Sequence, residues 1–240
     1  MARILRSLVS PPRDCAYLPD RLATLETRVM LDVTAAELET LLATGWRRFG
    51  PAYFRPACGS CTECVPVRVP VATFELSKNQ RRVLQRASHI RVEVGTPAVD
   101  DARLALYRRW HANREASRGW DHDDGDPDDY VMNFCFPHPA GREFSYWEGA
   151  ELLAVGIADE TPHALSDVYC FHAPEHGALS LGTLNVLSSL AYARERGLAH
   201  VYLGYRVEGC PSLRYKGRFK PQEKLAGGAW VNAAGADPSE

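Results

Sequence analysis

Three closely spaced cysteines are the first group in this sequence that could do chemistry. Cys58, Cys61 and Cys64 stand at i, i+3 and i+6, and their two-residue spacers let the chain fold back with the sulfurs pointing toward one centre. A closed structural site needs four ligands, and Cys15 is the candidate for the fourth. Four thiolates suit zinc or a [4Fe–4S] cluster, and spacing does not choose between them. The alternative is a set of free, buried cysteines.

Composition limits where such a protein works. The 240 residues carry seven cysteines and a formal net charge of −2, so nothing suggests a DNA-coating protein, and any RNA would be held by local basic patches. No apolar run approaches the roughly 18 residues that span a bilayer, and the N-terminus lacks the apolar core of a signal peptide. We expect a cytoplasmic protein with no membrane and no DNA partner. The cysteines Cys135, Cys170 and Cys210 stand in apolar surroundings and are expected in the core.

A basic helix follows the cysteines. Ser77 and Gln80 form a capping box, which predicts a helix from Ser77 to about Ser88. It contains no acidic residue, and its cations are Lys78, Arg81, Arg82 and Arg86. A surface of this kind binds phosphates. A cysteine cluster that leads into a phosphate-binding helix suggests a protein that handles a nucleic acid or nucleotide.

The elements that must position these groups are alternating helices and strands. A capping box at Thr34 and Glu37 opens a short helix that Gly45 stops. Alternating valines from Val65 to Val71 predict a strand, near a sheet edge because of its prolines. A strand over residues 90–94 and an amphipathic helix over residues 100–118 come next. The aspartate-rich stretch at 121–129 is either a divalent-cation loop or a solvated loop that ends in a helix N-cap at 127–129.

The second half of the sequence predicts a different architecture. Three strands over residues 144–148, 152–158 and 165–172 form a meander, a helix runs from Leu181-Gly182-Thr183 to about Arg196, and a strand covers residues 200–204. This is the order of an acyl-CoA N-acetyltransferase-like (GNAT-like) core, although fold alone does not fix function. We expect an α+β protein with a mixed, largely antiparallel sheet, divided into a cysteine-bearing domain (1–95) and a GNAT-like domain (96–240).

Several residues of this half could bind or react with a ligand. The mouth of the helix at Gly182 and Thr183 presents free N–H groups that could bind a pyrophosphate or the 3′ end of a tRNA; it could equally be a plain helix start. Asp167 and Tyr169 share a face of a predicted strand by alternation, and Asp167 could deprotonate an attacking amine or serve as a cap. Aromatic and cationic residues interleave near the C-terminus, and they could bind a carboxylate or phosphate and stack on a base, or form a solvated edge. They include Tyr205, Tyr215, Lys216 and Arg218.

These pieces, in this order, resemble a known family. They are Cys15-Ala-Tyr-Leu-Pro, Tyr53-Phe-Arg-Pro-Ala-Cys58-Gly-Ser-Cys61-Thr-Glu-Cys64-Val-Pro-Val-Arg68, Ser77-Lys-Asn-Gln80-Arg81-Arg82, Val168-Tyr169-Cys-Phe171 with Pro174, Ser180-Leu-Gly182-Thr183, Tyr202-Leu-Gly204-Tyr205, and Tyr215-Lys216 with Phe219-Lys-Pro221. The chain resembles the arginyl-tRNA–protein transferases and, more closely, their bacterial relatives, the aspartate/glutamate leucyltransferases.

The resemblance implies an enzyme that moves an amino acid from an aminoacyl-tRNA to the α-amine of proteins beginning with Asp or Glu, with leucine favoured as the donor and arginine as the alternative. It implies an iron–sulfur cluster or zinc on the N-terminal cysteines. Because the tRNA ester is already activated, transfer needs no further cofactor and no covalent nucleophile. The acidic acceptor side chain needs a cation, and Arg81, Arg82, Lys216 and Arg218 are the candidates.

Two other functions stay open. The chain could be an acyl-CoA-dependent N-acetyltransferase whose cysteines are purely structural. It could also be a relative that binds tRNA or acidic N-termini without transfer. Relatives commonly carry a lysine-methionine pair before the Tyr-Lys motif, where this chain reads Pro211-Ser-Leu-Arg-Tyr215-Lys216, and a small residue in place of Asp167.

Overall fold

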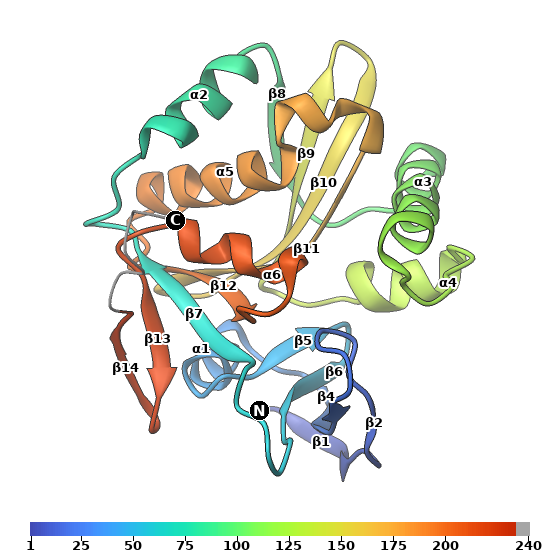
Figure 1. The fold of residues 1–240 in the computed structure, drawn as a ribbon, viewed down its shortest axis with the longest axis vertical. Helices are drawn as coiled ribbons and strands as arrows, with labels where there is room; N and C mark the ends of the chain where they lie inside the picture. The colour runs from blue at the N-terminus through green and yellow to red at the C-terminus, as the bar shows by residue number, and fades with distance from the viewer. Residues whose placement is uncertain (234–240) are drawn as a thin grey trace.

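The computed structural model describes residues 1–233, which build three β-sheets with helices around them (Figure 1). The N-terminal sheet is antiparallel and has the order β1-β4-β6-β5. Its strands are β1 (Arg3–Val9), β4 (Leu25–Leu31), β5 (Arg47–Phe49) and β6 (Ala52–Pro56). A pair of two-residue strands, β2 (Arg13–Asp14) and β3 (Leu22–Ala23), follows β1 along the chain.

Helix α1 (Ala35–Ala43) packs on this small sheet. The predicted capping box is confirmed, since the Thr34 side chain accepts from the backbone N–H of Glu37 and the Glu37 carboxylate accepts from the N–H of Thr34. The helix ends at Ala43 with Thr44 as its C-cap, directly before the predicted stop, Gly45, which has a φ of 84°. Leu38 and Leu42, four residues apart, place one face of α1 in a small core with Trp46 and Tyr53.

The large sheet has eight strands in the order β14-β13-β7-β12-β11-β10-β9-β8. Every neighbouring pair is antiparallel except β11 and β12, which are parallel. The predicted fold class, α+β with a mixed and largely antiparallel sheet, is therefore confirmed. The strands are β7 (Val65–Pro70), β8 (Arg91–Gly95), β9 (Gly141–Glu148), β10 (Glu151–Glu160), β11 (Ala164–His172), β12 (His200–Arg206), β13 (Glu223–Ala226) and β14 (Ala229–Asn232).

Helices cover both faces of the large sheet (Figure 1). On one face α5 (Leu181–Glu195) packs with α2 (Lys78–Arg86) over the larger core. On the other face lie α3 (Asp101–Arg118), the short α4 (Pro127–Tyr130) and the π-helical turn η1 (Val131–Cys135), over a second core rich in aromatic rings. The remaining elements are η2 (Pro174–Leu179), α6 (Pro211–Arg214) and η3 (Tyr215–Arg218).

One strand prediction is wrong, and the domain boundary is not tested by the sheet. Strand β7 is not at an edge, because β12 flanks one side and β13 the other. Its prolines are tolerated since β13 pairs with only Val67 and Arg68, between Pro66 and Pro70. Strands from both sides of residue 95 share the large sheet, and the domain division at that residue remains a prediction.

The parallel pair β11 and β12 separates soon after it begins. Their register contains only Ala164 opposite His200, Leu165 opposite Val201 and Ser166 opposite Tyr202, although both strands continue beyond it. Toward their carboxyl ends the two strands therefore form no further backbone pairs with each other. We call this opening the β11–β12 split.

Within residues 1–233, no helix combines the length and the apolar character needed to cross a bilayer.

Candidate functional site

Asp167 lies on β11 directly after the last residue that pairs with β12. Its Oδ1 accepts a 2.7 Å hydrogen bond from the hydroxyl of Ser189 on α5, while its Oδ2 is buried and has no hydrogen-bond partner among the described residues. Burial raises the pKa of this carboxyl to about 6, against the Ser189 hydrogen bond and the positive charges of Arg47 and Lys216. A buried oxygen without a donor is an incomplete arrangement that a ligand N–H can complete.

Lys216 is one of two cations whose positive charge acts on this carboxylate. It comes from η3, and its Nζ donates a 3.2 Å hydrogen bond to the backbone oxygen of Tyr205. Burial lowers the pKa of Lys216 to about 7, helped by Arg47 and opposed by Asp167 and Cys210. The predicted site residues Asp167 and Lys216 are therefore brought into one electrostatic group, although 49 positions separate them in the sequence.

Arg47 completes the group, and sequence reasoning missed it. The side chain is 9% exposed; its guanidinium donates a 2.7 Å hydrogen bond to Ser166 Oγ and a second, short one to the backbone oxygen of Asp167. A side chain at Gly204 (φ +80°) would come within 3.4 Å of both the Arg47 guanidinium and Lys216 Nζ. Glycine at 204 therefore lets the two cations approach the start of the split.

The group, which we call the Asp167–Lys216–Arg47 centre, holds two cations and one carboxylate in a mostly buried place. Arg47 is charged, and Lys216, with a pKa of about 7, is charged in part at neutral pH, so the group has a partial excess of positive charge that one more anion can neutralise. The local sequence around Arg47 does not predict this role, because two consecutive arginines in a strand give no sign of which one becomes buried. Only the assembled sheets place Arg47 beside Asp167. The next residue, Arg48, forms a separate buried ion pair with Asp159.

The predicted aromatic platform is only partly present. Tyr205 is 7% exposed, and its hydroxyl donates to the backbone oxygen of Gly45 at 2.9 Å. The expectation that it stacks on a ligand is wrong for this reason; its carbonyl instead holds Lys216. Tyr215 is half-buried beside Phe219, with ring centroids 6.4 Å apart, and burial raises its pKa.

Tyr169 does not share a face with Asp167, contrary to the alternation prediction. Opposite β11, Ile157 pairs with Tyr169 and the next residue, Ala158, pairs with Asp167. Val168 is therefore an extra residue, a β-bulge, which reverses the alternation of side chains. Asp167 faces α5, whereas Tyr169 packs in the aromatic core below α3, with its hydroxyl 3.0 Å from His111 Nε2.

Cys15, Cys58, Cys61 and Cys210 lie near Cys64, and the metal site predicted for Cys15, Cys58, Cys61 and Cys64 stays a prediction. Burial raises the pKa of Cys64 to about 12, and the charges of Cys15, Cys58, Cys61 and Cys210 raise it further. Within residues 1–233, all seven cysteines are free thiols, and no three cysteine sulfurs come within 4.8 Å of one another. Binding of a metal cation would favour the thiolate forms of these neighbouring thiols, and four such sulfurs are a donor set of the kind that zinc or an iron–sulfur cluster takes. Cys210, expected as a plain core residue, borders this group.

The cysteine group and the Asp167–Lys216–Arg47 centre are neighbours. Tyr17 lies between them: burial raises its pKa, as do Cys64, Cys210 and Cys15, while Arg47 lowers it. The loop after β12 also touches the N-terminal segment, since an added Cβ at Gly209 would lie 2.7 Å from the side chain of Leu18. The segment that supplies Cys15 thus supports the loop that leads to Lys216.

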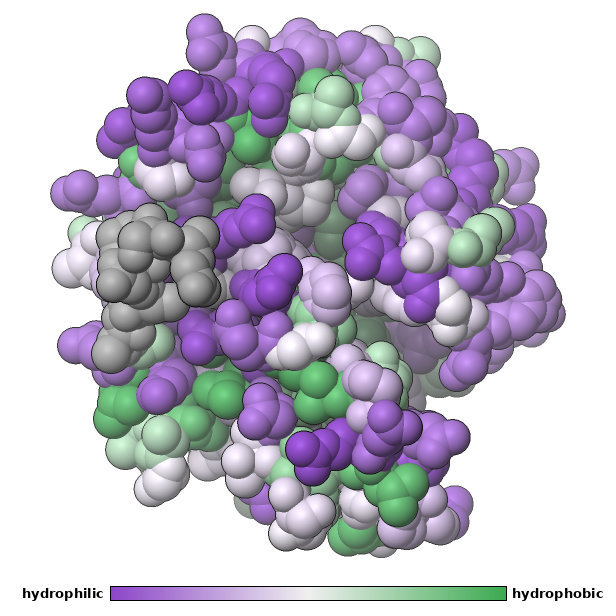
Figure 2. All heavy atoms as spheres, in the orientation of Figure 1, coloured by the Kyte–Doolittle hydropathy of each residue, from purple (hydrophilic) through white to green (hydrophobic). Residues whose placement is uncertain are grey.

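The basic helix α2 exposes its predicted cations. Its capping box at Ser77 and Gln80 is confirmed, and Lys78, Arg81 and Arg82 are all exposed. Figure 2 shows a strongly hydrophilic surface over this helix. Gln80 is an exception, being 5% exposed; its Oε1 accepts from the Ser77 N–H and its Nε2 donates to the backbone oxygen of Arg218. Gln80 therefore does not contact a ligand, and it ties α2 to exposed Arg218.

The first turn of α5 carries backbone N–H groups that could donate hydrogen bonds to a ligand. Ser180 precedes the helix with a φ of 54° and makes no side-chain capping bond. A Cβ at Gly182 would meet nothing within 4 Å, so the space in front of this turn is open. The N–H of Thr183 is engaged by the Ser180 carbonyl at 2.8 Å, which leaves the N–H groups of the first residues for an anion.

The aspartate-rich loop ends at a helix start, as one of the two alternatives predicted, but the cap is Asp126 and not one of residues 127–129. Asp126 caps α4 by accepting from the N–H groups of Asp128 and Asp129. Asp123 and Asp124 accept from the N–H groups two residues ahead, Gly125 and Asp126.

Comparison with known proteins agrees with these features. Residues 13–82 match the family described as "Arginine-tRNA-protein transferase, N terminus", and residues 102–226 match "Arginine-tRNA-protein transferase, C terminus". The chain is 37% identical to an aspartate/glutamate leucyltransferase of Marinobacter nauticus, over 94% of this chain and 96% of that protein. It is 35% identical to the protein of the same name from Stenotrophomonas maltophilia, over 94% and 92%.

Solved structures give weaker likenesses. L-PGS from Bacillus licheniformis has a TM-score of 0.44 at 14% identity, covering 60% of this chain and 45% of that one. FemX has a TM-score of 0.44 at 12% identity, covering 70% and 59%. The two matched family regions and the near full-length relatives lead to one conclusion: the chain belongs to the arginine-tRNA-protein transferase family.

Proposed function

We propose that this protein is an aspartate/glutamate leucyltransferase, which moves leucine from leucyl-tRNA to the α-amine of proteins that begin with Asp or Glu. The full-length relatives in Marinobacter nauticus and Stenotrophomonas maltophilia carry that name. The single observation that carries the proposal is the Asp167–Lys216–Arg47 centre, with its excess positive charge at the β11–β12 split. Charged tRNA and new N-termini meet in the cytoplasm, which is the compartment we propose.

Acceptor recognition is the task of the two cations. The acceptor side chain is a carboxylate, and a partly buried lysine beside an arginine binds a carboxylate through charge-assisted hydrogen bonds. Lys216 has two donors left beyond its bond to the Tyr205 carbonyl. Asn or Gln at the acceptor N-terminus would leave this positive charge without its counter-charge, which gives a reason for the preference for Asp and Glu.

Asp167 orients the acceptor amine in this proposal. Its free Oδ2 accepts an N–H of the α-ammonium group, while Ser189 fixes the other oxygen. Alignment of amine and ester accounts for most of the catalysis that such a reaction needs, because the ester is already activated.

The tRNA is held elsewhere, by exposed cations and the start of α5. Lys78, Arg81 and Arg82 of α2, together with Arg218, contact the phosphate backbone. The open turn at Gly182 and Thr183 takes a phosphate near the 3′ end. Because Gln80 joins α2 to the Arg218 backbone, the tRNA-binding helix and the loop with Lys216 are connected.

The cysteine group fits a metal centre, and Cys15, Cys58, Cys61 and Cys64 would hold it. A bound zinc or iron–sulfur cluster would supply structural cross-linking between the N-terminal segment and the strand β7. The transfer itself uses no cofactor.

A transfer assay tests the proposal. Labelled leucyl-tRNA and arginyl-tRNA are each incubated with peptides beginning Asp, Glu, Asn, Lys and Ala, using protein purified without oxygen. We expect leucine on the Asp and Glu peptides alone. Arginine in place of leucine would correct the donor, and tRNA binding without product would indicate a binding-only relative. Stabilisation by acetyl-CoA, seen as a higher melting temperature, would support an N-acetyltransferase instead.

A further inference from the structure

Several arginines stack on aromatic rings within residues 1–233, and all but one of them are also paired with a carboxylate. The paired ones are Arg28 and Arg55 with Glu26, Arg68 with Glu223, Arg91 with Glu93, and Arg196 with Glu160. The exception is Arg114, whose Cζ lies 3.7 Å from the centre of the Trp110 ring. Arg114 is therefore the one stacked cation of the described chain whose charge has no counter-charge.

Two N–H donors at this contact also have no acceptor. The Nε of Arg114 and the Nε1 of Trp110 are buried, and neither forms a hydrogen bond with any of residues 1–233. Trp110 as a whole is only 6% exposed, so water does not replace the protein acceptor. Buried donors without acceptors are rare, because burial removes their hydrogen bonds to water. A ligand that accepts from both donors would restore these bonds.

Both donors lie near the hydroxyl of Tyr169, on the α3 face of the large sheet. Burial raises the pKa of Tyr169, and the Trp110 N–H and the Arg114 charge each oppose that rise, although the indole forms no hydrogen bond with the phenol. Arg114 and Tyr169 are only partly buried, and the terminal nitrogens of Arg114 are not among the buried atoms that lack partners. A small ligand can therefore approach the guanidinium from solvent.

The charges that act on Arg114 also favour an anion. Burial lowers the pKa of Arg114, and the positive charge of Arg118 lowers it further, while Tyr169 acts in the opposite direction. Arg118 stands four residues after Arg114 on α3, a spacing at which two like charges on a helix repel each other. An anion bound at Arg114 would offset both the cost of burial and this repulsion.

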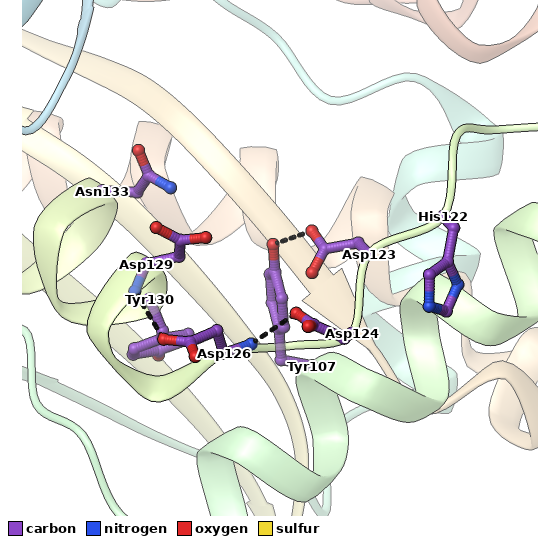
Figure 3. Close-up of a pocket in the computed structure, with 8 residues that line it drawn as sticks. All are labelled: Tyr107, His122, Asp123, Asp124, Asp126, Asp129, Tyr130 and Asn133. Carbon is purple, nitrogen blue, oxygen red and sulfur yellow. Dashed lines mark hydrogen bonds between the residues drawn. The ribbon is translucent and has the colours of Figure 1, made fainter.

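The carboxylates on the neighbouring elements are engaged by other groups. Glu115 accepts a 2.9 Å hydrogen bond from the backbone N–H of Asp123. The Asp123 carboxylate accepts a 2.7 Å hydrogen bond from a tyrosine hydroxyl at the cavity of the aspartate-rich loop (Figure 3). Glu175, on η2, is paired with Arg109 at 3.0 Å. The anion for Arg114 would therefore have to come from outside these residues.

We propose that Arg114 and Trp110 form a binding site for a small oxyanion, a carboxylate or a phosphate, on the α3 face of the large sheet. The anion accepts from the indole N–H and from the fork of Nε and one terminal nitrogen of the guanidinium, which suits both kinds of oxyanion. The Trp110 ring orients the guanidinium for this contact. The site lies across the sheet from the Asp167 carboxylate, and it does not depend on the proposed function.

Anion titrations of the full-length protein and of Arg114→Gln test this site. Sodium phosphate and sodium acetate are each titrated at constant ionic strength, and binding is followed by calorimetry. The difference between the two proteins is the measure, because cations on the α5 side of the sheet can also bind phosphate. We expect at least one anion to bind in an Arg114-dependent way with a dissociation constant of about 1 mM or lower. The tighter of the two anions identifies the ligand as a phosphate or a carboxylate.

Further variants separate the site from the general charge of α3. Trp110→Phe keeps the ring but removes the N–H, so the affinity should fall about 10-fold, the effect of losing one hydrogen bond to a charged group. Arg109→Gln is the matched control, because this exposed arginine of α3 already has a carboxylate partner. Trp147→Phe is a second control, since its Nε1 is also buried without a partner but the arginine over its ring is paired. Both controls should bind as the wild type does.

Melting curves without added anion establish that each variant is folded before affinities are compared. If neither anion bound the wild type more tightly than Arg114→Gln at concentrations up to about 20 mM, the site would be refuted. An equal loss of affinity in Arg109→Gln would refute it too, because the effect would then belong to the overall charge of the helix. Arg114-dependent binding that Trp110→Phe also weakens, with both controls unchanged, would establish the site.

Discussion

Asp167 and Tyr169 lie on opposite faces of the large sheet, although only Val168 separates them along β11. The bulge at Val168 opposite Ile157 and Ala158 produces this reversal, and it occurs where β11 has left its parallel partner β12. The carboxylate therefore lies on the α5 side of the sheet, and the phenol lies on the α3 side in the aromatic core. Bulges commonly re-aim side chains at active sites in this way.

Loss of the Lys216 charge should weaken acceptor recognition selectively. For Lys216→Met we expect a 10- to 100-fold rise in KM for an Asp-initiated peptide, about the value of a hydrogen bond to a charged group. The KM for leucyl-tRNA should stay unchanged. Lys224→Met, on β13, is the control. Equal losses for acceptor and tRNA would contradict the assignment of Lys216 to the acceptor.

The exposed arginines of α2 should set the salt dependence of tRNA binding. Arg81→Gln with Arg82→Gln removes two phosphate contacts, so the slope of log K against log salt should fall by about 1.5. Filter binding at several salt concentrations measures it. The double variant Arg109→Gln and Arg118→Gln, on α3 across the sheet, should keep the wild-type slope; an equal fall there would mean that the charge effect is general.

Metal content should depend on the cysteine group. Cys58→Ser and Cys15→Ser should each lower the metal-to-protein ratio and the melting temperature, because binding of a structural metal is coupled to folding. Cys135 lies outside the group, so Cys135→Ser should retain the wild-type metal-to-protein ratio and melting temperature. If Cys15→Ser kept the wild-type metal content, Cys15 would not be the fourth ligand, and Cys210 would be tested next by Cys210→Ser.

Asp167 should make stability fall as pH rises from about 4 to about 6. Its folded pKa of about 6 lies above the ordinary value of 3.8, so the folded state binds the extra proton, and this stabilisation is complete below about pH 4 and lost as pH passes 6. Urea unfolding at pH 4, 5, 6 and 7 would show the slope. Asp167→Asn should reduce it, and an unchanged slope would contradict the raised pKa.

Local sequence signals predicted most of the elements but not the way the site is assembled. The capping boxes at Thr34 and Ser77 depend on contacts three residues apart, so they could be read directly and are confirmed. Arg47 enters the site only because β5 is packed near Ser166, 119 positions away. His111 and Asp123 likewise meet Tyr169 only in the folded chain. The bulge at Val168 has no sequence signature, and strict alternation therefore gave the wrong face for Tyr169.

The two hydrogen bonds of Gln80 explain why the third residue of that helix is glutamine and not glutamate. Either residue closes a capping box through its side-chain oxygen, but only the amide also has hydrogens to give to the Arg218 carbonyl. Glutamate there would keep the helix start and turn an attractive contact with that carbonyl into a repulsive one. One amide group thus serves two contacts, so a substitution at residue 80 would change the connection between two parts of the enzyme as well as the helix itself.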